Sequence, residues 1–270
     1  MSSELAAGAT TYRVEACNIA RASENRIHDD GVARAFGFAG GLVPGVEVYA
    51  YASHAPIALW GRAWLERGGL ECRFLKPVYD GRVATVTAEP DGAALALGVE
   101  SEGVACARGR AELGAARPPL PQLEAYLRVL PPADRPPADE QSLAPGTALG
   151  IAPFAVTHER LLQYLRDVRE SAALYTEEGL VHPGQLLRTC NLALSQNVLL
   201  GPWIHTASRV QNFAPARVGE TLSVRARVLG NYERKGHRLV DLDVVVLAEE
   251  SRVLAQVLHT AIYRLRPTRA

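Results

Sequence analysis

The stretch GGLVPGVEVYAYASHAPIALWG, residues 40–61, recurs in outline as GLVHPGQLLRTCNLALSQNVLLG, residues 179–201. Each copy begins with a glycine-bounded turn, passes through a Pro-Gly pair and continues as a long apolar segment. Proline is favoured at the start of a helix, because its missing N–H group would have no partner there. We therefore predict one long helix in each half of the chain, opened by the Pro-Gly pair.

A second pair of segments keeps the same spacing. FLKPVYDG, residues 74–81, corresponds to FAPARVG, residues 213–219, and an alternating run follows each of them. Three pairs of residues are separated by the same 138 positions: Val43 and Val181, Pro77 and Pro215, and Gly81 and Gly219. Three coincidences at one separation, in the same order, indicate two copies of one structural unit.

The two copies are joined by a proline-rich segment. Residues 114–147 contain eight prolines: Pro118, Pro119, Pro121, Pro131, Pro132, Pro136, Pro137 and Pro145. Proline removes backbone donors and interrupts regular elements, so this segment is predicted to be a connector, with one short helix at LEAYLRVL. We expect a first domain at residues 1–115, a linker at 116–148 and a second domain at 149–270.

The rest of each copy is typical of antiparallel strands. TYRVEACNI, residues 11–19, alternates as a first strand, and a hairpin tip is expected at residues 231–236. The remaining expected strands alternate with period two: 71–78, 82–89, 94–101, 104–113, 208–217, 221–233, 238–250 and 253–265. One apolar helix against an antiparallel sheet is an α+β architecture. Two such sheets can pair edge to edge, which removes an exposed edge strand from each.

Composition narrows the class of protein. The chain has 270 residues, of which 48% are hydrophobic and 21% are charged, and its formal net charge is zero. This share of hydrophobic residues favours a large globular core. Balanced charge predicts no nucleic-acid partner and no membrane surface, and no apolar run is long enough to span a bilayer. The start, MSSELAAGATTYRVEA, is unlike a secretion signal. The four cysteines are scattered without metal-ligand spacing. We expect a cytoplasmic protein with reduced cysteines, no metal and no cofactor.

Residues 23–45 read SENRIHDDGVARAFGFAGGLVPG. This segment resembles the signature of the MaoC-like, R-specific enoyl-CoA hydratase branch of the hotdog superfamily, which runs D-x-N-P-x-H-x-D before a helix-opening glycine. Seven residues match that signature: Asn25, His28, Asp30, Ala33, Gly37, Phe38 and Gly45. Together with the repeat, the resemblance implies a double hotdog, in which two long central helices are each wrapped by an antiparallel sheet.

The segment also departs from that signature. Ser23 stands where the family carries its aspartate, and Arg26 replaces the family proline. Pro44 precedes the helix-opening glycine where the family has a histidine, although the second copy has His182 near that place. The corresponding segment of the second copy, residues 161–179, lacks the N-x-x-H pattern.

The resemblance implies chemistry on an acyl thioester, bound to coenzyme A or to an acyl carrier. Addition of water to an enoyl thioester, or its removal, needs groups that move protons and donors aimed at the thioester oxygen. Histidine suits the first task, and the free amides at a helix start suit the second. The candidate catalytic residues are His28, Asn25 and Asp30, and the candidate substrate-binding residues are Gly45, Val46, Ser23, His182 and Gly184.

Several alternatives remain open at this point. Asp30 fits the first turn of a short helix better than it fits catalysis, whereas Asn25 either holds a turn or points at the substrate, and the family match favours the second. A carboxylate replacing the missing aspartate is sought among Glu24, Glu47, Asp167 and Glu170.

The leading function is a hydratase or dehydratase of the MaoC-like type. The alternatives are a hotdog thioesterase, in which Asp167 or Glu170 directs water, and a non-catalytic binder of acyl thioesters. Double-hotdog chains are also expected to be able to pair as a homodimer.

Overall fold

The computed structural model describes residues 8–266. Residues 1–7, which begin the stretch predicted not to be a secretion signal, and residues 267–270 lie outside the described part. The first half contains these elements in order: β1 (Thr10–Glu15), the 3-10 helix η1 (Arg26–His28), α1 (Asp30–Ala35), α2 (Gly45–Trp60), α3 (Arg62–Arg67), β2 (Gly68–Phe74), β3 (Val83–Asp91), β4 (Ala94–Ser101) and β5 (Val104–Leu113).

The second half repeats this order after a long connection. Its elements are η2 (Leu123–Ala125), β6 (Ala148–Gly150), β7 (Phe154–Ala155), α4 (His158–Asp167), α5 (Ala173–Glu177), α6 (Pro183–Ser195), β8 (Ile204–Asn212), β9 (Thr221–Arg234), β10 (His237–Ala248) and β11 (Arg252–Arg264). None of the helices within residues 8–266 combines the length and the apolar character needed to cross a bilayer.

The strands form one sheet across both halves. Their order is β1-β3-β4-β5-β2-β8-β11-β10-β9-β6, with β7 also paired to β9. The halves meet where β2 lies antiparallel to β8, with Cys72 opposite Ser208. This is the predicted edge-to-edge pairing, and it gives each half a neighbour in place of an exposed edge.

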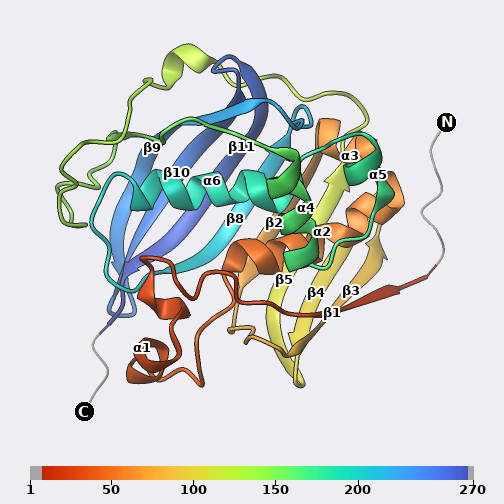
Figure 1. Cartoon of the computed structure of the whole chain (residues 1–270), viewed down its shortest axis with the longest axis horizontal. Helices are drawn as coiled ribbons and strands as arrows, with labels where there is room; N and C mark the ends of the chain where they lie inside the picture. Colours follow the sequence, from red (N-terminus) through yellow and green to blue (C-terminus); the bar gives the residue numbers. More distant parts are fainter. Residues whose placement is uncertain (1–7, 267–270) are drawn as a thin grey trace.

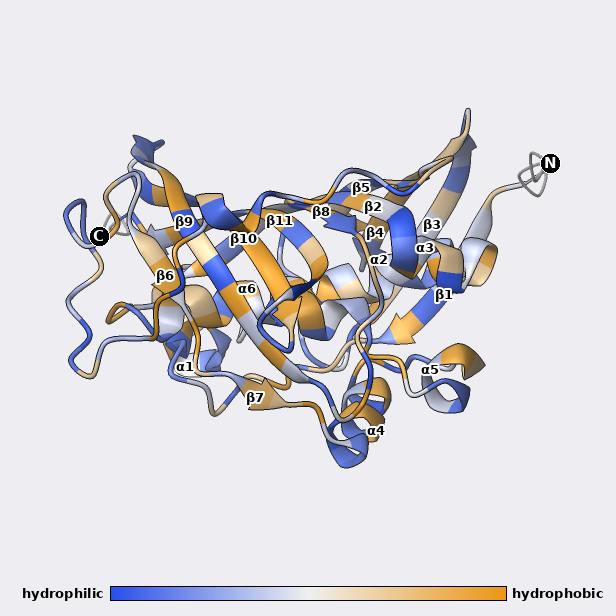
Figure 2. Cartoon of the chain, turned by 90° about the horizontal axis from the view of Figure 1, so that it is seen from above, coloured by the Kyte–Doolittle hydropathy of each residue, from blue (hydrophilic) through white to orange (hydrophobic). Residues whose placement is uncertain are grey.

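The two long helices lie on the same side of this sheet (Figures 1 and 2). Helix α2 is buried from Val46 to Ser53, on every side, because α6 and the sheet cover it. A helix that is apolar all round needs such cover, which the sequence VEVYAYAS anticipates. One apolar core therefore runs through both halves, from Leu70 beneath α2 to Leu194 on α6.

The 138-residue repeat is confirmed in the backbone contacts. Leu42 bridges to Tyr79 in the first copy, and Leu180 bridges to Arg217 in the second. The helices obey the same spacing, because α2 begins at Gly45 and α6 begins at Pro183. The structural counterpart of Pro44 is therefore His182, and Gly184 lies one residue further into its helix than Gly45 does.

Two local predictions have different outcomes. The hairpin tip at residues 231–236 is confirmed, with Lys235 and Gly236 both at positive φ in the turn. The short helix predicted at residues 123–130 is wrong, since only the 3-10 turn η2 forms there. The nine residues between Pro121 and Pro131 are too few for a helix that is stable by itself. Tyr126 is instead buried against Phe213 and Val245, and its hydroxyl donates to Asp243 at 2.8 Å.

Candidate active site

The neighbours of His28 fix the tautomer of its imidazole ring. It ends the turn η1, which the Asn25 side chain caps by accepting from the Ile27 amide. The His28 Nδ1 lies 2.7 Å from the Leu42 carbonyl oxygen. Because a carbonyl only accepts, Nδ1 carries the proton and Nε2 presents a lone pair. The Asn25 amide donates to that Nε2 at 3.3 Å.

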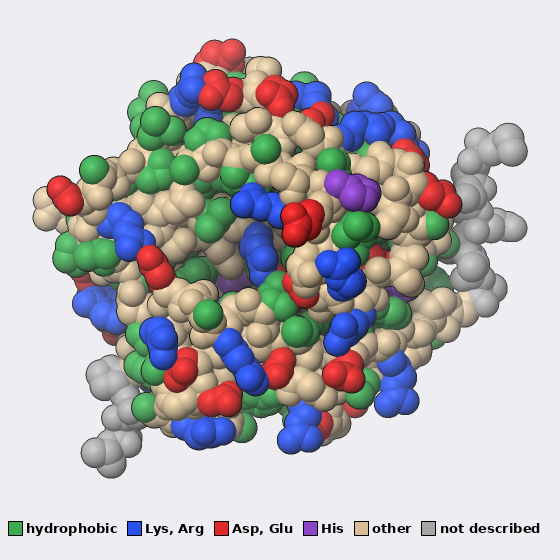
Figure 3. Space-filling view, in the orientation of Figure 1, with side chains coloured by type: hydrophobic (Ala, Val, Ile, Leu, Met, Phe, Trp, Pro, Cys, Tyr) green, Lys and Arg blue, Asp and Glu red, His purple; other side chains and the backbone are tan. Residues whose placement is uncertain are grey.

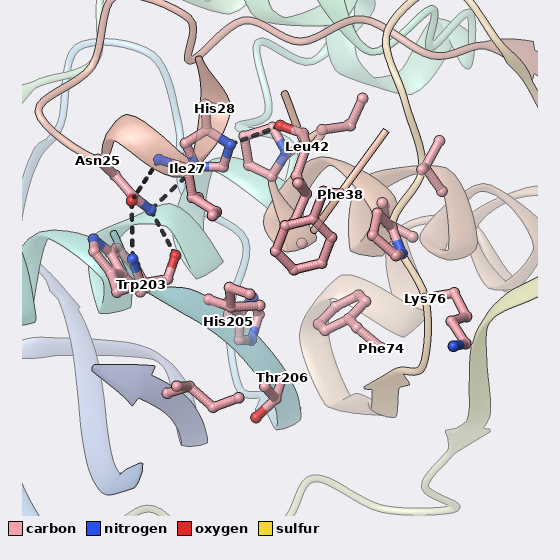
Figure 4. A pocket seen from close by; sticks show the side chains of 18 of the residues that line it. Asn25, Ile27, His28, Phe38, Leu42, Phe74, Lys76, Trp203, His205 and Thr206 are labelled. Atoms are coloured by element: carbon pink, nitrogen blue, oxygen red, sulfur yellow. Dashed lines mark hydrogen bonds between the residues drawn. The ribbon is translucent and has the colours of Figure 1, made fainter. Parts of the chain in front are cut away.

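Asn25 also ties this turn to the second copy. Its Oδ1 accepts from the Trp203 amide at 3.1 Å, and its Nδ2 donates to the Trp203 carbonyl at 3.0 Å. All of these bonds are drawn in Figure 4. Both ends of the Asn25 amide are therefore engaged by protein groups, so this residue positions His28 across a separation of 178 residues.

Burial sets the charge of His28. The ring is almost wholly buried, and this burial lowers the pKa of His28 from its ordinary value. The Leu42 carbonyl opposes the change by bonding Nδ1–H, and the charge of Arg188 lowers the pKa further. At neutral pH the imidazole is therefore uncharged, and its basic atom is Nε2, whose lone pair accepts from the Asn25 amide.

His28 lies on the wall of a cavity of about 290 Å³, which we call the His28 cavity. Its wall is mainly apolar and includes Ile27, Phe38, Leu42, Val43, Val48, Phe74, Leu75, Ile204, Ile262 and Leu265. Polar groups enter the wall at His28, Asn191, His205 and the start of α2. A mainly apolar pocket with a few polar groups is typical of small-molecule sites.

The start of α2 opens into this cavity at Gly45. Within residues 8–266 the amides of Gly45 and Val46 have no acceptor, since the first N–H groups of a helix lack intrahelical partners. The positive end of the helix dipole adds to their attraction for an anion. A Cβ at Gly45 would lie 2.9 Å from the His205 Nδ1 and 3.2 Å from the Phe74 ring, so glycine keeps this approach open.

A second hollow of about 490 Å³, which we call the outer cleft, lies beside the first. The two share Asn25, His28, Pro44, Asn191 and Trp203 on their walls. The outer cleft is more polar, and its wall includes Ser23, Val46, Arg135 and Arg188. In the space-filling view the face that carries α6 is hollowed near its middle, with basic side chains at the rim (Figure 3).

The matching position in the second copy is closed. The His182 Nδ1 accepts from the Gly184 amide at 3.1 Å, so the side chain caps α6. A Cβ at Gly184 would overlap the Tyr164 hydroxyl and lie 2.9 Å from the Ala50 Cβ. Neither His182 nor Gly184 lies on the wall of the His28 cavity or of the outer cleft.

Comparison with known proteins gives the fold. No family model matches the sequence, and no curated protein matches it. A MaoC-domain protein from Chloroflexus aurantiacus, named as a dehydratase, superposes with a TM-score of 0.63 at 11% identity, over 96% of this chain and 95% of that one. A conserved hypothetical protein from Mycobacterium tuberculosis with a double hotdog fold superposes with a TM-score of 0.66 at 14% identity, over 94% and 95%.

This chain is a double hotdog. A dehydratase domain from the CurJ module of the curacin polyketide synthase is a further structural match, with a TM-score of 0.55 at 12% identity, over 96% of this chain and 92% of that one. The double hotdog predicted from the repeat and from residues 23–45 is thus confirmed.

Asp30 occupies a different place in this double hotdog from His28. Its Oδ1 accepts from the Gly41 amide at 2.8 Å, its side chain is exposed, and it is absent from the walls of both hollows. Ser23 lies on the wall of the outer cleft, where its hydroxyl is 3.4 Å from the Asn25 carbonyl. The structure therefore brings together His28, Asn25 and Gly45, and leaves Asp30 outside this group.

The candidate replacement carboxylates are engaged elsewhere. Glu47 is buried and its Oε1 lies 2.8 Å from the Arg188 guanidinium. Both oxygens of Glu170 lie 3.1 Å from the His54 Nδ1. Glu170 and Asp167 are absent from the wall of the His28 cavity. Glu24 lies on the outer cleft but is paired with Arg135 at 2.9 Å.

Three wall residues were not identified from the sequence: Asn191, Trp203 and His205. They follow or lie within the second copy's apolar segment. From sequence alone, a polar side chain there cannot be told from one that caps a helix or lies on the surface. His205 alone has a weak signal, as a histidine two residues from Trp203 in an otherwise strand-like run. No group of three or more His, Cys, Asp or Glu side chains suited to a metal ion occurs between residues 8 and 266.

Proposed function

We propose that this double hotdog is a hydratase or dehydratase of acyl thioesters. The observation that carries the proposal is that the basic Nε2 of an uncharged His28 and the free amide of Gly45 belong to one cavity wall. These are the two groups that enoyl hydration needs, a proton carrier and a donor for the thioester oxygen. Two of the structural matches described above are named as dehydratases, which supports the same class.

The chemistry follows from these two groups. In hydration, water replaces the Asn25 N–H at His28 Nε2 and gives its proton to that nitrogen as the water oxygen bonds the β-carbon of the enoyl thioester. The electron pair of the double bond moves toward the thioester carbonyl, and the Gly45 amide stabilises the charge that develops on its oxygen. The proton on Nε2 then passes to the α-carbon. Dehydration is the same path in reverse.

The two hollows divide the substrate between them. The apolar wall of the His28 cavity suits the acyl chain, because burial of apolar surface is its main source of binding energy. The outer cleft, with Arg135 and Arg188 on its wall, suits the polar arm of coenzyme A or of an acyl carrier. The thioester then lies at the groups that both walls share, next to His28.

The alternative of a thioesterase has less support. It requires a carboxylate that directs water at the thioester carbonyl, and both Asp167 and Glu170 lie off the cavity wall. Non-catalytic binding draws support from Ser23, which cannot act as a charged base. The test therefore has to separate three outcomes.

The experiment follows two signals from the same wells, with purified protein and a panel of enoyl-CoA and saturated acyl-CoA esters. Loss of the conjugated-thioester absorbance without release of free thiol is the result expected for a hydratase. Release of thiol would overturn the proposal in favour of a thioesterase. If neither signal changes while acyl-CoA binds in a titration, the chain is a binder and the proposal is wrong.

The first prediction concerns His28. His28→Ala and His28→Asn should each lower kcat for hydration by about 10²- to 10⁴-fold, because both lack the base. Asn retains an amide donor for the Leu42 carbonyl and so preserves the local fold. His158→Ala, at the exposed first residue of α4, is the matched control and should retain full activity. Full activity in a folded His28→Asn variant would contradict the assignment.

A further inference from the structure

A second buried histidine faces the start of α2. His205, near the beginning of β8, is only 5% exposed and lies on the wall of the His28 cavity. Its Nδ1 has no hydrogen-bond partner within the described chain. Figure 4 shows its ring across the cavity from His28, beside Phe74. Nδ1 is also the atom that a Cβ at Gly45 would approach to 2.9 Å.

The hydrogen-bond partners of Nε2 decide the tautomer of the His205 ring. Its Nε2 lies 3.1 Å from the Ala207 carbonyl oxygen and 2.7 Å from the Ser208 hydroxyl. The carbonyl can only accept, so Nε2 carries the proton and Nδ1 keeps an unpaired lone pair, on the side of the ring next to Gly45. The Ser208 hydroxyl in turn lies 3.1 Å from the Nδ1 of His259, whose ring stacks on His205 with centroids 4.2 Å apart.

Packing alone does not account for this residue. The ring contacts Phe74 edge-on and His259 face-on, and its Nε2–H bonds the Ala207 carbonyl, but none of these contacts uses Nδ1. A histidine there leaves a buried acceptor unpaired, which costs free energy unless a ligand donates to it. Burial, with the charge of His259 second, holds the pKa of His205 well below its ordinary value, so the lone pair persists at neutral pH.

We propose that the His205 Nδ1 accepts a hydrogen bond from the water that is added to, or removed from, the substrate. This rests on the proposed hydratase function and supplies the second water-binding group, for which Ser23 has no carboxylate. In hydration, one O–H of the water points to His205 and the other to His28. His28 takes its proton as the water oxygen bonds the β-carbon, the double-bond pair moves to form the enolate, and the α-carbon then takes the proton back from His28. His205 stays neutral and orients the water throughout.

The test uses two variants of His205 with the enoyl-CoA hydration assay. His205→Leu removes the acceptor and should lower kcat by about 10- to 100-fold, with KM changed less than about 3-fold. His205→Asn places a side-chain oxygen near the former Nδ1 and should recover most of kcat. Asn212→Ala is the matched control, because it removes a buried polar side chain from the far end of β8 without touching the cavity.

The pH dependence of kcat/KM separates this role from a structural one. Besides His205 the cavity wall carries His28, Lys76 and His237 as titratable groups, and His259 packs behind it. In the wild type both His28 and His205 must be neutral. Because burial holds the pKa of His205 well below its ordinary value, His28 sets the acid limb of kcat/KM, and that limb should keep its position and its one-proton slope in His205→Asn and His205→Leu. A structural role, in which the substitution disturbs the start of α2 and the setting of His28, would move the limb.

The outcomes are distinct. Wild-type kcat in folded His205→Leu, equal losses in the Leu and Asn variants, or a displaced acid limb of kcat/KM in both variants would each overturn the role of His205 and leave the hydratase function standing. A wild-type protein that hydrates no enoyl-CoA would instead overturn the proposed function, and the role of His205 with it.

Discussion

Single residues near the cavity show how burial and hydrogen bonds set charge. His28 is buried and bonded through Nδ1–H, so its pKa is lowered and its Nε2 remains basic. Asn25 completes this arrangement by donating to Nε2 and by holding Trp203 on the other side. A neutral donor in that position leaves the imidazole uncharged, whereas an anion would favour the imidazolium.

Asn25→Asp therefore tests the charge of His28. Because activity needs the neutral ring and the pKa is lowered, wild-type activity should persist below pH 6.5 and fall only as the pH drops through the lowered pKa. A carboxylate near Nε2 raises that pKa, so the acid limb of kcat/KM should move up by about one pH unit or more. Asn231→Asp, on β9 and absent from the walls of both hollows, is the control. An unmoved acid limb in Asn25→Asp would mean that His28 does not set it.

At the scale of elements, the two central helices differ at their first turns: the start of α2 is open and the start of α6 is covered. Helix α2 begins after Pro44, which provides no side-chain cap; its first residue, Gly45, lies on the wall of the His28 cavity, and Val46 lies on that of the outer cleft. Helix α6 is capped by His182 and covered by the Tyr164 hydroxyl. The repeat therefore supplies two helix starts of the same design, and only that of α2 has space in front of it.

Gly45→Ala is expected to impair catalysis more than folding. The new methyl group would contact the His205 Nδ1 and the Phe74 ring inside the cavity, where a substrate would approach the backbone. We expect kcat/KM for enoyl-CoA to fall by about tenfold or more, since a displaced thioester loses its donor, and chemical denaturation to show a loss of stability of about 1 to 3 kcal/mol. Wild-type kcat/KM in this variant would show that substrate does not reach Gly45.

Gly184→Ala is expected to impair folding more than catalysis. Its methyl group meets Tyr164 and Ala50 in a closed core, so overpacking should cost about 1 to 3 kcal/mol of unfolding free energy. The activity of the folded fraction should be unchanged. In a Tyr164→Phe background, which removes the crowding hydroxyl, the cost of Gly184→Ala should shrink. A cost that is the same in both backgrounds would place the clash elsewhere.

At the scale of the whole molecule, the copies are joined by the shared sheet and by a buried polar contact between them. Glu170, in the second copy, accepts from the His54 ring on α2 and from the Ser171 and Ala172 amides. Burial alone would raise the pKa of Glu170, but the hydrogen bond from His54 and the nearby His182 ring, whose Nε2 lies 3.8 Å from Oε2, outweigh it and hold the pKa below its ordinary value. Tyr12, stacked on His54 at 3.8 Å, closes this contact from β1.

Stability should therefore depend on acid through Glu170. A carboxylate with a lowered pKa stabilises the fold above its unfolded value, near pH 4.3, and loses that contribution as the pH falls through the folded value. Glu170→Gln should cost about 1 to 3 kcal/mol of unfolding free energy at pH 7 and flatten the decline of stability at acid pH. Glu66→Gln, which breaks a pair with the exposed Arg62, should cost under about 1 kcal/mol. Identical pH profiles of wild type and Glu170→Gln in urea melts would exclude this contribution.

Local sequence patterns were sufficient to predict the two repeated units and part of the candidate site. The 138-residue spacing predicted the repeat, the apolar run after Pro44 predicted a buried helix, and the turn from Asn25 to His28 marked one catalytic candidate. These features are readable because periodicity and turn residues report on burial and backbone direction within a few residues. The helix predicted at residues 123–130 was wrong because long-range packing decides this segment: Tyr126 is buried against Phe213 and Val245, and no local pattern records that contact.

The rest of the site is a product of tertiary packing. Trp203 and His205 reach the His28 cavity only because β2 pairs with β8, which brings together residues more than 170 positions apart. No local pattern distinguishes the open start of α2 from the closed start of α6, because the difference is a tyrosine that packs against one and not the other. Nor does a pattern show that Asp30 faces Gly41 instead of the cavity. Long-range contacts decide which of two equivalent helix ends keeps its amides free, and sequence periodicity carries no record of those contacts.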